Sequence, residues 1–538
     1  MIRSRKLLIR AAGLTDSVNI QQNARELFES VLALTQGHPS LQELHCELQS
    51  HYQRLHQPMQ VAIVGKIKAG KSTMMNALLG EQMVATGAEE LTFNVNWLRY
   101  ASEPFLLVHY KDDRPAEEKS LEELESLTRR RGFDLEQLKQ VKYVEVGYPN
   151  DMLKNFNLID TPGLGSAYLD DSRNTLDFLG LDAHKLTERT EAEASGADAI
   201  LYLFSQSIGQ SDKSILEEFQ GATIGEASPI NTIGVLTRID AYWPTEDNPL
   251  AGGQNVINRL RSEHNEVKGV FYNIFPVSGL LAFGAKTLTR EEHGTLLQLA
   301  RLPQTRFQRL IRNVNRFAQR EYDDIDVSSQ RRQSLLMRLG QFGIGEAYSA
   351  ISDGIGEKDA LSQALVNRSG LPQLTDCVMS HFGNRAFLIK LSTGLHKTAA
   401  SCFVAERRLS GLERGIVSQI RAKFEAFEAQ QHEFTELRIL RSYYDGGLEI
   451  SPDEAQHLLQ ITGEYGASIG ERLGADQQAD PATLLAACRE RKRYWYQRAN
   501  DVMGAGRATI SAANALARSY ERIEYNLSRG PGSADRQN

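Results

Sequence analysis

Apolar side chains between residues 14 and 57 recur with the spacing of amphipathic helices. One stripe runs from Val18 to Leu34 and a second from Leu41 to Leu55, and the breaker sequence Gly-His-Pro at 37–39 separates them. The pattern therefore predicts two helices within residues 1–57, ahead of any strand.

From residue 59 the pattern changes to short apolar runs that alternate with amphipathic stretches. The apolar runs predict strands at 59–65, 94–100, 105–110, 141–146, 153–159, 199–204, 232–236 and 271–277. The helical stretches between them favour an α/β fold with a doubly wound, mostly parallel sheet. We place this domain at residues 58–385.

Beyond about residue 280 the sequence predicts helices only. Residues 385–441 contain no proline, which predicts one continuous helix of about 56 residues and about 84 Å. A second long helical stretch ends near residue 527. We expect the two to pair in an elongated α-helical stalk at 386–528 with its tip near 443–482, joined by the helices of 1–57 as a neck. Residues 529–538 have the composition of a disordered tail.

Composition and charge narrow the class of protein. The chain has 538 residues, with 61 Lys and Arg against 68 Asp and Glu, and a net charge of −7. This acidic balance argues against a general nucleic-acid-binding protein. Four cysteines far apart in the sequence favour reduced thiols over disulfides or a zinc site. We expect no signal peptide and no transmembrane helix, hence a cytoplasmic protein, with peripheral membrane contact left open.

The strongest chemical signal is the sequence GKIKAGKS at 65–72, which follows an apolar strand and opens a helix. It matches the pattern GxxxxGK[ST], in which backbone N–H groups wrap phosphates, the lysine reaches the β- and γ-phosphate oxygens, and the hydroxyl ligates Mg²⁺. We assign nucleotide binding to Gly65, Lys66, Ala69, Gly70, Lys71, Ser72 and Thr73.

A second motif, Asp160-Thr-Pro-Gly163, ends a later strand. Asp160 is predicted to hold Mg²⁺ through water, and the Gly163 amide to sense the γ-phosphate. Thr92, twenty residues after Ser72, is the candidate for completing the Mg²⁺ shell. The predicted metal set is therefore Ser72, Thr92 and Asp160.

A third pair of motifs selects the base. Thr237-Arg238-Ile-Asp240 ends another strand as a variant of [NT]KxD, and Ser278 follows the last strand. Asp240 can accept hydrogen bonds from the guanine N1 and N2 donors, which adenine lacks. Motifs in this order at strand ends indicate a guanine nucleotide at the carboxyl edge of the sheet.

The run VAIVGKIKAGKSTMMNALLGEQMVATGAEELTFNVNWLRY, with DTPGLGS and the later RSGLPQL at 368–374, resembles dynamin-superfamily GTPases, especially the bacterial dynamin-like proteins. The resemblance covers about residues 58–385 at motif level. It implies GTP hydrolysis with Mg²⁺, a homodimer across the GTP face, and a helical stalk that moves with nucleotide state. It also implies membrane remodelling in many members, and it leaves open a second related chain as partner.

Three residues depart from the usual pattern of such GTPases. Leu164 stands where Ras-like proteins carry a water-orienting glutamine, and Arg238 replaces the usual lysine. Lys68 lies where guanylate-binding relatives place an arginine finger, so we hypothesise that it supplies positive charge in cis. A solvated lysine, or one paired with Glu89 or Glu90, is the alternative. The predicted catalytic set is Lys71, Thr92 and Lys68.

Other interpretations remain open at this stage. One is a nucleotide-gated scaffold that scarcely hydrolyses GTP without a partner chain or lipid, and another is a ribosome- or RNA-associated G protein. Basic and aromatic residues also interleave at 489–498. They suit either a lipid surface or a contact between two helices.

Overall fold

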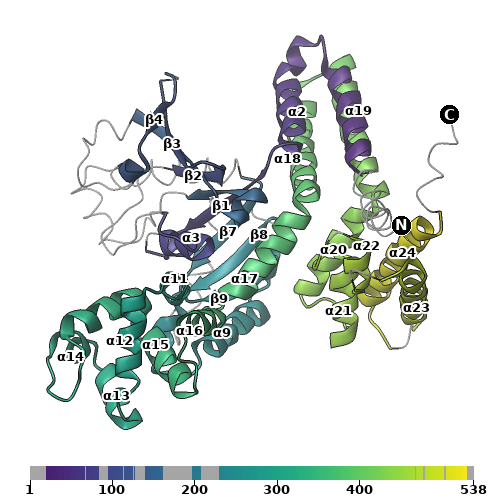
Figure 1. Cartoon of the computed structure of the whole chain (residues 1–538). Helices are drawn as coiled ribbons and strands as arrows, with labels where there is room; N and C mark the ends of the chain where they lie inside the picture. Colours follow the sequence, from purple (N-terminus) through teal and green to yellow (C-terminus); the bar gives the residue numbers. More distant parts are fainter. Residues whose placement is uncertain are drawn as a thin grey trace. The chain divides into compact units, whose positions relative to one another are not determined.

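The computed structural model describes residues 20–66, 68–83, 95–112, 114–124, 127, 140–160, 197–206, 230–466, 468–476, 479–501 and 504–529. The chain divides into two compact units (Figure 1). One is Gln60–Val378, and the other combines Met1–Met59 with Met379–Asn538. Each unit is described by itself below.

The first unit is built on a nine-stranded sheet with the strand order β4-β3-β5-β2-β6-β1-β7-β8-β9. Parallel pairs join β1 to β7, β7 to β8, β8 to β9 and β2 to β5, whereas β2–β6, β3–β4 and β3–β5 are antiparallel. The strands are β1 (Met59–Gly65), β2 (Val95–Tyr100), β3 (Phe105–Tyr110), β4 (Glu117–Lys119), β5 (Val141–Tyr148), β6 (Phe156–Asp160), β7 (Ala199–Phe204), β8 (Thr232–Thr237) and β9 (Ile274–Val277). The α/β prediction is confirmed.

The central strands have apolar side chains on both faces. β1, β7 and β8 are buried along their whole length, as expected for parallel strands covered by helices on both sides. On one face, alternate residues such as Val64 and Tyr202 pack against Val256 and Leu260 of α9 (Pro249–Glu263). This packing holds the carboxyl ends of β1, β7 and β8 in fixed register.

Helices that follow the sheet form a second core in the same unit, built around α11 and α15. The helices of this core are α11 (Gly279–Lys286), α12 (Arg290–Leu299), α13 (Gln304–Ile311), α14 (Val314–Gln319), α15 (Ser329–Ser352) and α16 (Lys358–Asn367), and α17 (Leu371–Cys377) follows them in the chain. Arg332 of α15 is fully buried and donates to the backbone carbonyls of Phe317, Val327 and Arg320. These bonds fix the chain between α14 and α15.

Apart from Met59, the first residue of β1, the regular structure of the second unit is helical in its described part, and the predicted helical region formed by N- and C-terminal segments is confirmed. Residues 20–35 form a helix, followed by α2 (Gln42–Leu55). The C-terminal segment supplies α18 (Ala386–Arg408), α19 (Gly411–Gln430), α20 (His432–Tyr444), α21 (Pro452–Ile461), α22 (Ile469–Leu473), α23 (Pro481–Ala499) and α24 (Arg507–Arg529).

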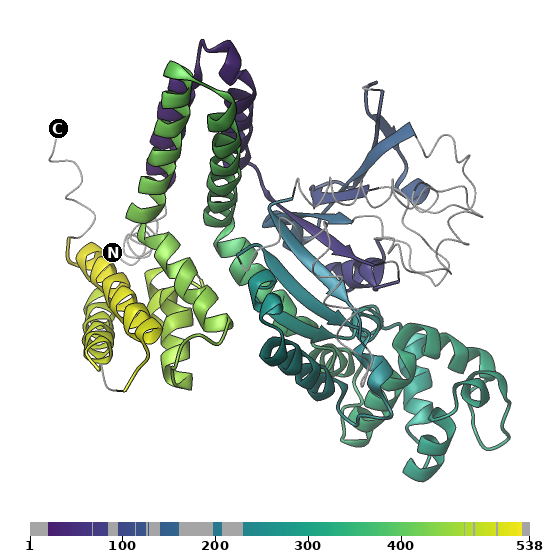
Figure 2. The same cartoon turned by 180° about the vertical axis from the view of Figure 1, so that it is seen from behind.

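Segments from the two ends of the chain pack together in this unit (Figure 2). Lys390 of α18 donates to the carbonyls of Leu55 and Gln57 and so caps the end of α2. The Phe28 ring lies 6.0 Å from the Phe424 ring of α19. The two N-terminal helices therefore complete the core that α18 and α19 begin.

The prediction of one helix over 385–441 was wrong. The chain reverses at Leu409 and Ser410, where both residues take extended backbone angles, and a second break falls at Gln431. Gly411, at the start of α19, has a φ of 61°, a conformation that favours glycine. Sequence periodicity alone carried no signal of this reversal.

The segment predicted as the stalk tip, 443–482, lies elsewhere than expected. Glu464 in this segment pairs with Arg385 at the start of α18, with 2.8 Å between Oε2 and Nη1, and both side chains are buried. Arg385 also donates to the Thr462 carbonyl. A segment bonded to the beginning of α18 does not form the end of a stalk. The turn at 409–410 lies at the opposite end of α18 from Arg385.

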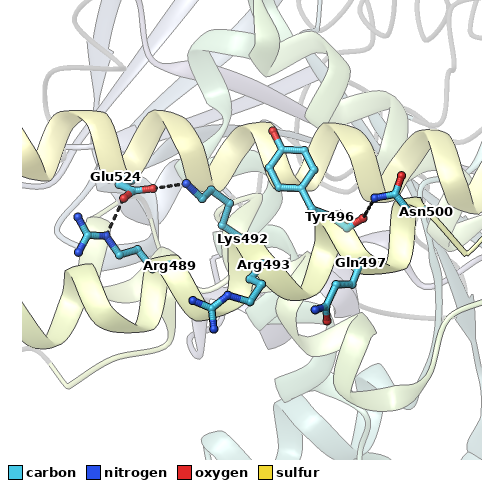
Figure 3. Close-up of a pocket in the computed structure, with 7 residues that line it drawn as sticks. All are labelled: Arg489, Lys492, Arg493, Tyr496, Gln497, Asn500 and Glu524. Atoms are coloured by element: carbon cyan, nitrogen blue, oxygen red, sulfur yellow. Dashed lines mark hydrogen bonds and ion pairs between the residues drawn. The ribbon is translucent and has the colours of Figure 1, made fainter.

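The basic and aromatic residues of α23 contact neighbouring helices. Arg489 and Lys492 lie 2.7 and 2.5 Å from the two carboxylate oxygens of Glu524 on α24 (Figure 3). Trp495 is buried, and Tyr494 donates to Glu454 of α21. These contacts favour the interpretation of 489–498 as a helix–helix contact over a lipid surface.

Candidate nucleotide-binding site

The loop after β1 carries the first group of predicted residues. At Gly65 a Cβ would overlap the carbonyl oxygen of Leu203 in β7, so glycine is required where these two strands converge. The loop closes with a hydrogen bond from the Ala69 N–H to the Lys66 carbonyl, 3.0 Å. Gly70 has a φ of 89° and forms the N-cap of α3 (Lys71–Leu79). A helix N-terminus thus opens directly at the end of a buried strand, the arrangement that binds phosphate groups.

Lys71 lies at the start of α3 and is almost fully buried. Its Nζ donates to the carbonyls of Gly65 (3.2 Å) and Lys66 (3.3 Å). Burial lowers the pKa of Lys71 to about 8, and the nearby Asp160 charge opposes that shift. One acceptor ends β1 and the other begins the loop, and both are backbone carbonyls, so the ammonium has no carboxylate bonded to it in the described structure.

Asp160 ends β6 beside Lys71 and is completely buried. Burial raises its pKa to about 6, opposed by the Lys71 charge and by the Asn96 amide. Within the described residues neither carboxylate oxygen has a hydrogen-bond partner. A buried carboxylate without partners is costly, and a cation with its waters would satisfy it.

The described residues contain no cluster of three or more His, Cys, Asp or Glu side chains suited to a metal ion. Ser72 and Asp160 nevertheless fit the donor set of Mg²⁺. This ion commonly takes one or two protein oxygens, keeps several waters and takes the rest of its ligands from phosphates.

The predicted base-recognition residues meet at the ends of β8 and β9. Thr237 Oγ1 lies 2.9 Å from the Ala69 carbonyl and 3.0 Å from the Phe204 carbonyl, so it ties β8 to the phosphate loop and to β7. Arg238 is exposed, with a φ of 60°. Asp240 follows in the short 3-10 helix η5 (Ile239–Tyr242), and its Oδ1 accepts from Ser278 Oγ at 2.8 Å.

The structure describes some of the remaining predicted residues and not others. Thr73 follows Ser72 in the first turn of α3, and both are partly exposed. Lys68 is exposed and has a φ of 64°, uncommon for a residue other than glycine. Thr92 and Gly163, together with Leu164, Glu89 and Glu90, lie outside the described residues.

Two features of the site were missed from the sequence. Asn96 of β2 faces Asp160 across the antiparallel pair of β2 and β6 and is fully buried. A lone asparagine inside the apolar strand sequence VNWLRY was the available signal. Ser369 and Gly370 contact the loop of Ser278. Their motif, RSGLPQL, resembles the dynamin superfamily but predicts no role for either residue.

Comparison with known proteins places one segment of the chain in a family. A profile of the Dynamin family matches residues 61–239, the span from β1 to η5. Residues 61–239 therefore carry a Dynamin-family domain, and the chain is similar to bacterial dynamin-like proteins. The predicted dynamin resemblance is therefore confirmed.

Individual relatives extend the match beyond that span. The isoniazid-induced protein IniC of Mycobacterium tuberculosis is 28% identical over 519 residues, 93% of this chain and 98% of the relative. Dynamin-like protein 2 of Campylobacter jejuni is 34% identical over 160 residues, 30% of this chain and 24% of the relative. A solved structure described as an oligomerised bacterial dynamin pair aligns over 94% of this chain and 86% of its own, with 14% identity and a TM-score of 0.30. A score that low carries no argument about assembly.

Proposed function

We propose that this chain binds a guanine nucleotide together with Mg²⁺ and hydrolyses GTP. The carrying observation is the buried Asp160, which has no hydrogen-bond partner among the described residues and lies beside Lys71 at the N-terminus of α3. The Asp160 carboxylate can accept from a hydrated cation and the Lys71 ammonium can donate to phosphate, and both groups lie at the same edge of the sheet.

The chain's own residues have distinct roles in this proposal. Lys71 exchanges its bonds to the Gly65 and Lys66 carbonyls for phosphate oxygens, and the N–H groups at the start of α3 donate to the same phosphates. Ser72 would hold the ion directly and Asp160 would hold it through water. When bound, Mg²⁺ neutralises charge on the phosphates.

Base recognition falls to Asp240 in the same proposal. Ser278 occupies one of its carboxylate oxygens, and the described structure contains no hydrogen bond to the other. Thr237 supports the arrangement by tying β8 to the phosphate loop, and Arg238 would cover the purine. A base without the guanine N1 and N2 donors would leave the carboxylate unsatisfied.

Thr92 and Lys68 complete the catalytic set that we propose. Thr92 would join the Mg²⁺ shell when the γ-phosphate is present, and Lys68 would supply positive charge in cis. Backbone strain in a residue other than glycine is often retained at functional sites, which supports Lys68. Full GTP turnover by a Lys68→Ala variant would reject its part without touching the rest.

A direct experiment separates GTP hydrolysis from binding alone. Fluorescent GDP and GTP analogues are titrated into the protein with Mg²⁺ and with EDTA, and phosphate release is followed at several protein concentrations. We expect binding to weaken at least about tenfold in Lys71→Ala, and turnover to rise with concentration. Binding without turnover at any concentration, or with lipid, would favour the nucleotide-gated scaffold, and turnover stimulated by RNA would favour the RNA-associated class.

We also propose that the chain forms a homodimer through its GTPase unit and that nucleotide state changes the conformation of its helical unit. The Dynamin-family domain supports both parts, and the breaks of the helical path at 409–410 and 431 support only the conformational part. Light scattering with GDP, and with GDP plus aluminium fluoride, tests it. One monomeric mass in both states would contradict the dimer. We also propose a second, related dynamin-like chain as a partner, in addition to the homodimer.

A specific surface supports the membrane part of the prediction. Near the turn at 409–410, Phe403, Val404 and Leu412 are 56%, 47% and 74% exposed. Arg407, Arg408 and Arg414 are exposed around them, while nearby Glu406 and Glu413 are bonded to Arg421 and Ser40. Apolar side chains rimmed by arginine suit an anionic bilayer surface. No described helix is long and apolar enough to cross a membrane, so we propose peripheral contact at this turn.

A further inference from the structure

The turn between α16 and α17 touches the base-recognition loop directly. The backbone N–H of Ser278 donates to the Ser369 carbonyl at 2.9 Å. Ser278 is the residue whose hydroxyl donates to Asp240 Oδ1. Two hydrogen bonds therefore connect Asp240 to a turn about 130 residues later in the chain.

Gly370 makes the contact tight. Its φ is 80°, and a Cβ there would overlap the carbonyl oxygen of Pro276 and crowd the Leu250 side chain. Pro276 lies two residues before Ser278, in β9. A side chain at 370 could be accommodated only if the end of β9 moved away from the turn. Glycine is thus needed for conformation and for space.

The turn itself is held rigidly by its own hydrogen bonds. Ser369 is fully buried, and its hydroxyl donates to the Val366 carbonyl and accepts from the Leu371 N–H. Arg368 donates to Glu346 Oε2 of α15 at 2.6 Å and to the Glu346 carbonyl. A turn anchored on α15 in this way can act as a fixed support for a neighbouring loop.

The loop that it supports is oriented by one side chain. Ser278 is the N-cap of α11, and its hydroxyl accepts from the Leu281 N–H while it donates to Asp240. The direction of that donation depends on where the Ser278 backbone stands, and the Ser369 carbonyl sets that position. The order of dependence therefore runs from the Ser369–Gly370 turn to Ser278 and then to Asp240.

We propose that the Ser369–Gly370 turn is a positioning element for guanine recognition. It fixes the Ser278 loop and thereby the direction in which Asp240 presents its carboxylate to the base. The proposal rests on the function proposed above, in which Asp240 accepts from both guanine donors. Ser369 and Gly370 touch no nucleotide themselves. They act through Ser278.

Comparing GDP with IDP isolates this role, because inosine lacks the 2-amino donor of guanine. A misdirected carboxylate weakens GDP binding more than IDP binding, because GDP presents two donors to it and IDP only one. The ratio of the IDP to the GDP dissociation constant should therefore fall. General loosening of the fold would weaken both nucleotides alike and leave the ratio unchanged. The ratio is measured by competition against a fluorescent GDP analogue on the full chain with Mg²⁺.

Gly370→Ala is the main variant, and Gly345→Ala in α15 is its matched control, because a Cβ at 345 meets nothing within 4 Å. We expect the ratio to fall at least about threefold in Gly370→Ala and to stay at the wild-type value in Gly345→Ala. Ser369→Ala, which keeps the carbonyl but loses both hydroxyl bonds, should lower the ratio less. If Gly370→Ala does not fold, Ser369→Ala alone decides the matter.

Asp240→Ala distinguishes a failure of the proposed function from a failure of the positioning role of the turn. If its ratio equals that of the wild type, Asp240 does not read the base and the proposed function fails at that residue. If Asp240→Ala lowers the ratio while Gly370→Ala and Ser369→Ala do not, only the positioning role of the turn is overturned.

Discussion

Asn96 and Asp160 stand directly opposite each other in the antiparallel pair of β2 and β6, and both are fully buried. The asparagine lowers the pKa of the aspartate, although neither side chain has a hydrogen bond of ordinary geometry in the described structure. Both side chains can therefore form further hydrogen bonds, and they lie at the edge of the sheet where α3 begins with Lys71. The pair matches a site prepared for a hydrated ion.

Replacing Asn96 with alanine should weaken Mg²⁺-dependent nucleotide binding. Without the amide dipole, the pKa of Asp160 rises above about 6, because the buried charge loses its one neutral stabilising neighbour. Affinity measured against pH should show its acid limb shifted upward by roughly half a unit to one unit, with about a three- to tenfold loss near that limb. Isothermal titration with and without Mg²⁺ measures both effects.

Asn258→Ala is a suitable control for that variant, because Asn258 is exposed on α9 and serves only a helical side-chain contact. An unchanged pH profile in Asn96→Ala would show that the amide is structural. A loss of affinity that is equal with Mg²⁺ and with EDTA would show the same.

Asp160→Asn should stabilise the nucleotide-free protein while it abolishes Mg²⁺-dependent binding. The pKa of Asp160 is raised to about 6 from 3.8, so the folded state holds a proton more tightly than the unfolded state. The destabilisation is absent below pH 3.8, grows between pH 3.8 and 6, and is complete above pH 6. At pH 7.5 the variant should gain about 1–3 kcal/mol in the free energy of unfolding.

Denaturant unfolding of the nucleotide-free protein at pH 7.5 and at pH 4 measures this gain. The two proteins should differ clearly at pH 7.5 and much less at pH 4. A variant less stable than the wild type at pH 7.5 would mean that the carboxylate is held by favourable bonds, contrary to its unpartnered state.

Gly65→Ala should disrupt the phosphate loop more than its small size suggests. The added methyl group would overlap the Leu203 carbonyl of β7, and a backbone atom inside a sheet cannot give way as a flexible side chain can. We expect a loss of about 1–3 kcal/mol in stability and nucleotide binding below detection. Gly294→Ala in α12 is the control, since a Cβ there meets nothing within 4 Å. Wild-type nucleotide affinity in Gly65→Ala would contradict the close approach of β1 and β7.

Strands with continuous apolar runs were predictable from the sequence almost to the residue. β1, β3 and β7 have the predicted bounds, because turn residues or polar clusters end each run sharply. β4 escaped prediction since its sequence, Glu117-Glu118-Lys119, is wholly polar. An edge strand that pairs on one side only needs no apolar signal.

The helical unit shows where sequence reasoning stops. A long stretch without proline fits one straight helix as well as three shorter ones, and only tertiary partners decide between them. Glu464 and Arg385 are 79 positions apart, so their pairing left no local pattern. The same holds for Asn96 beside Asp160, and for Gly370 against Pro276. Motifs located the site, whereas the residues that orient it come from distant parts of the chain.

Replacing the exposed apolar side chains near the turn at 409–410 with aspartate should abolish membrane contact. In the double variant Phe403→Asp/Leu412→Asp, two exposed apolar groups become anions beside an anionic surface. Each apolar side chain is worth about 1.5–3 kcal/mol when fully buried, so even partial insertion makes the loss large. Flotation with vesicles containing anionic lipid should show at least a fivefold drop in the bound fraction. Nucleotide affinity should stay unchanged.

Met337→Asp is the control, because Met337 is also an exposed apolar side chain, 67% exposed, and lies on α15 in the other unit. Binding of the wild type should also fall with added salt, since Arg407 and Arg408 contribute by attraction to the lipid headgroups. Vesicle binding that survives the double variant would place the contact on another surface. Equal loss in Met337→Asp would show that added negative charge alone, at any position, prevents binding.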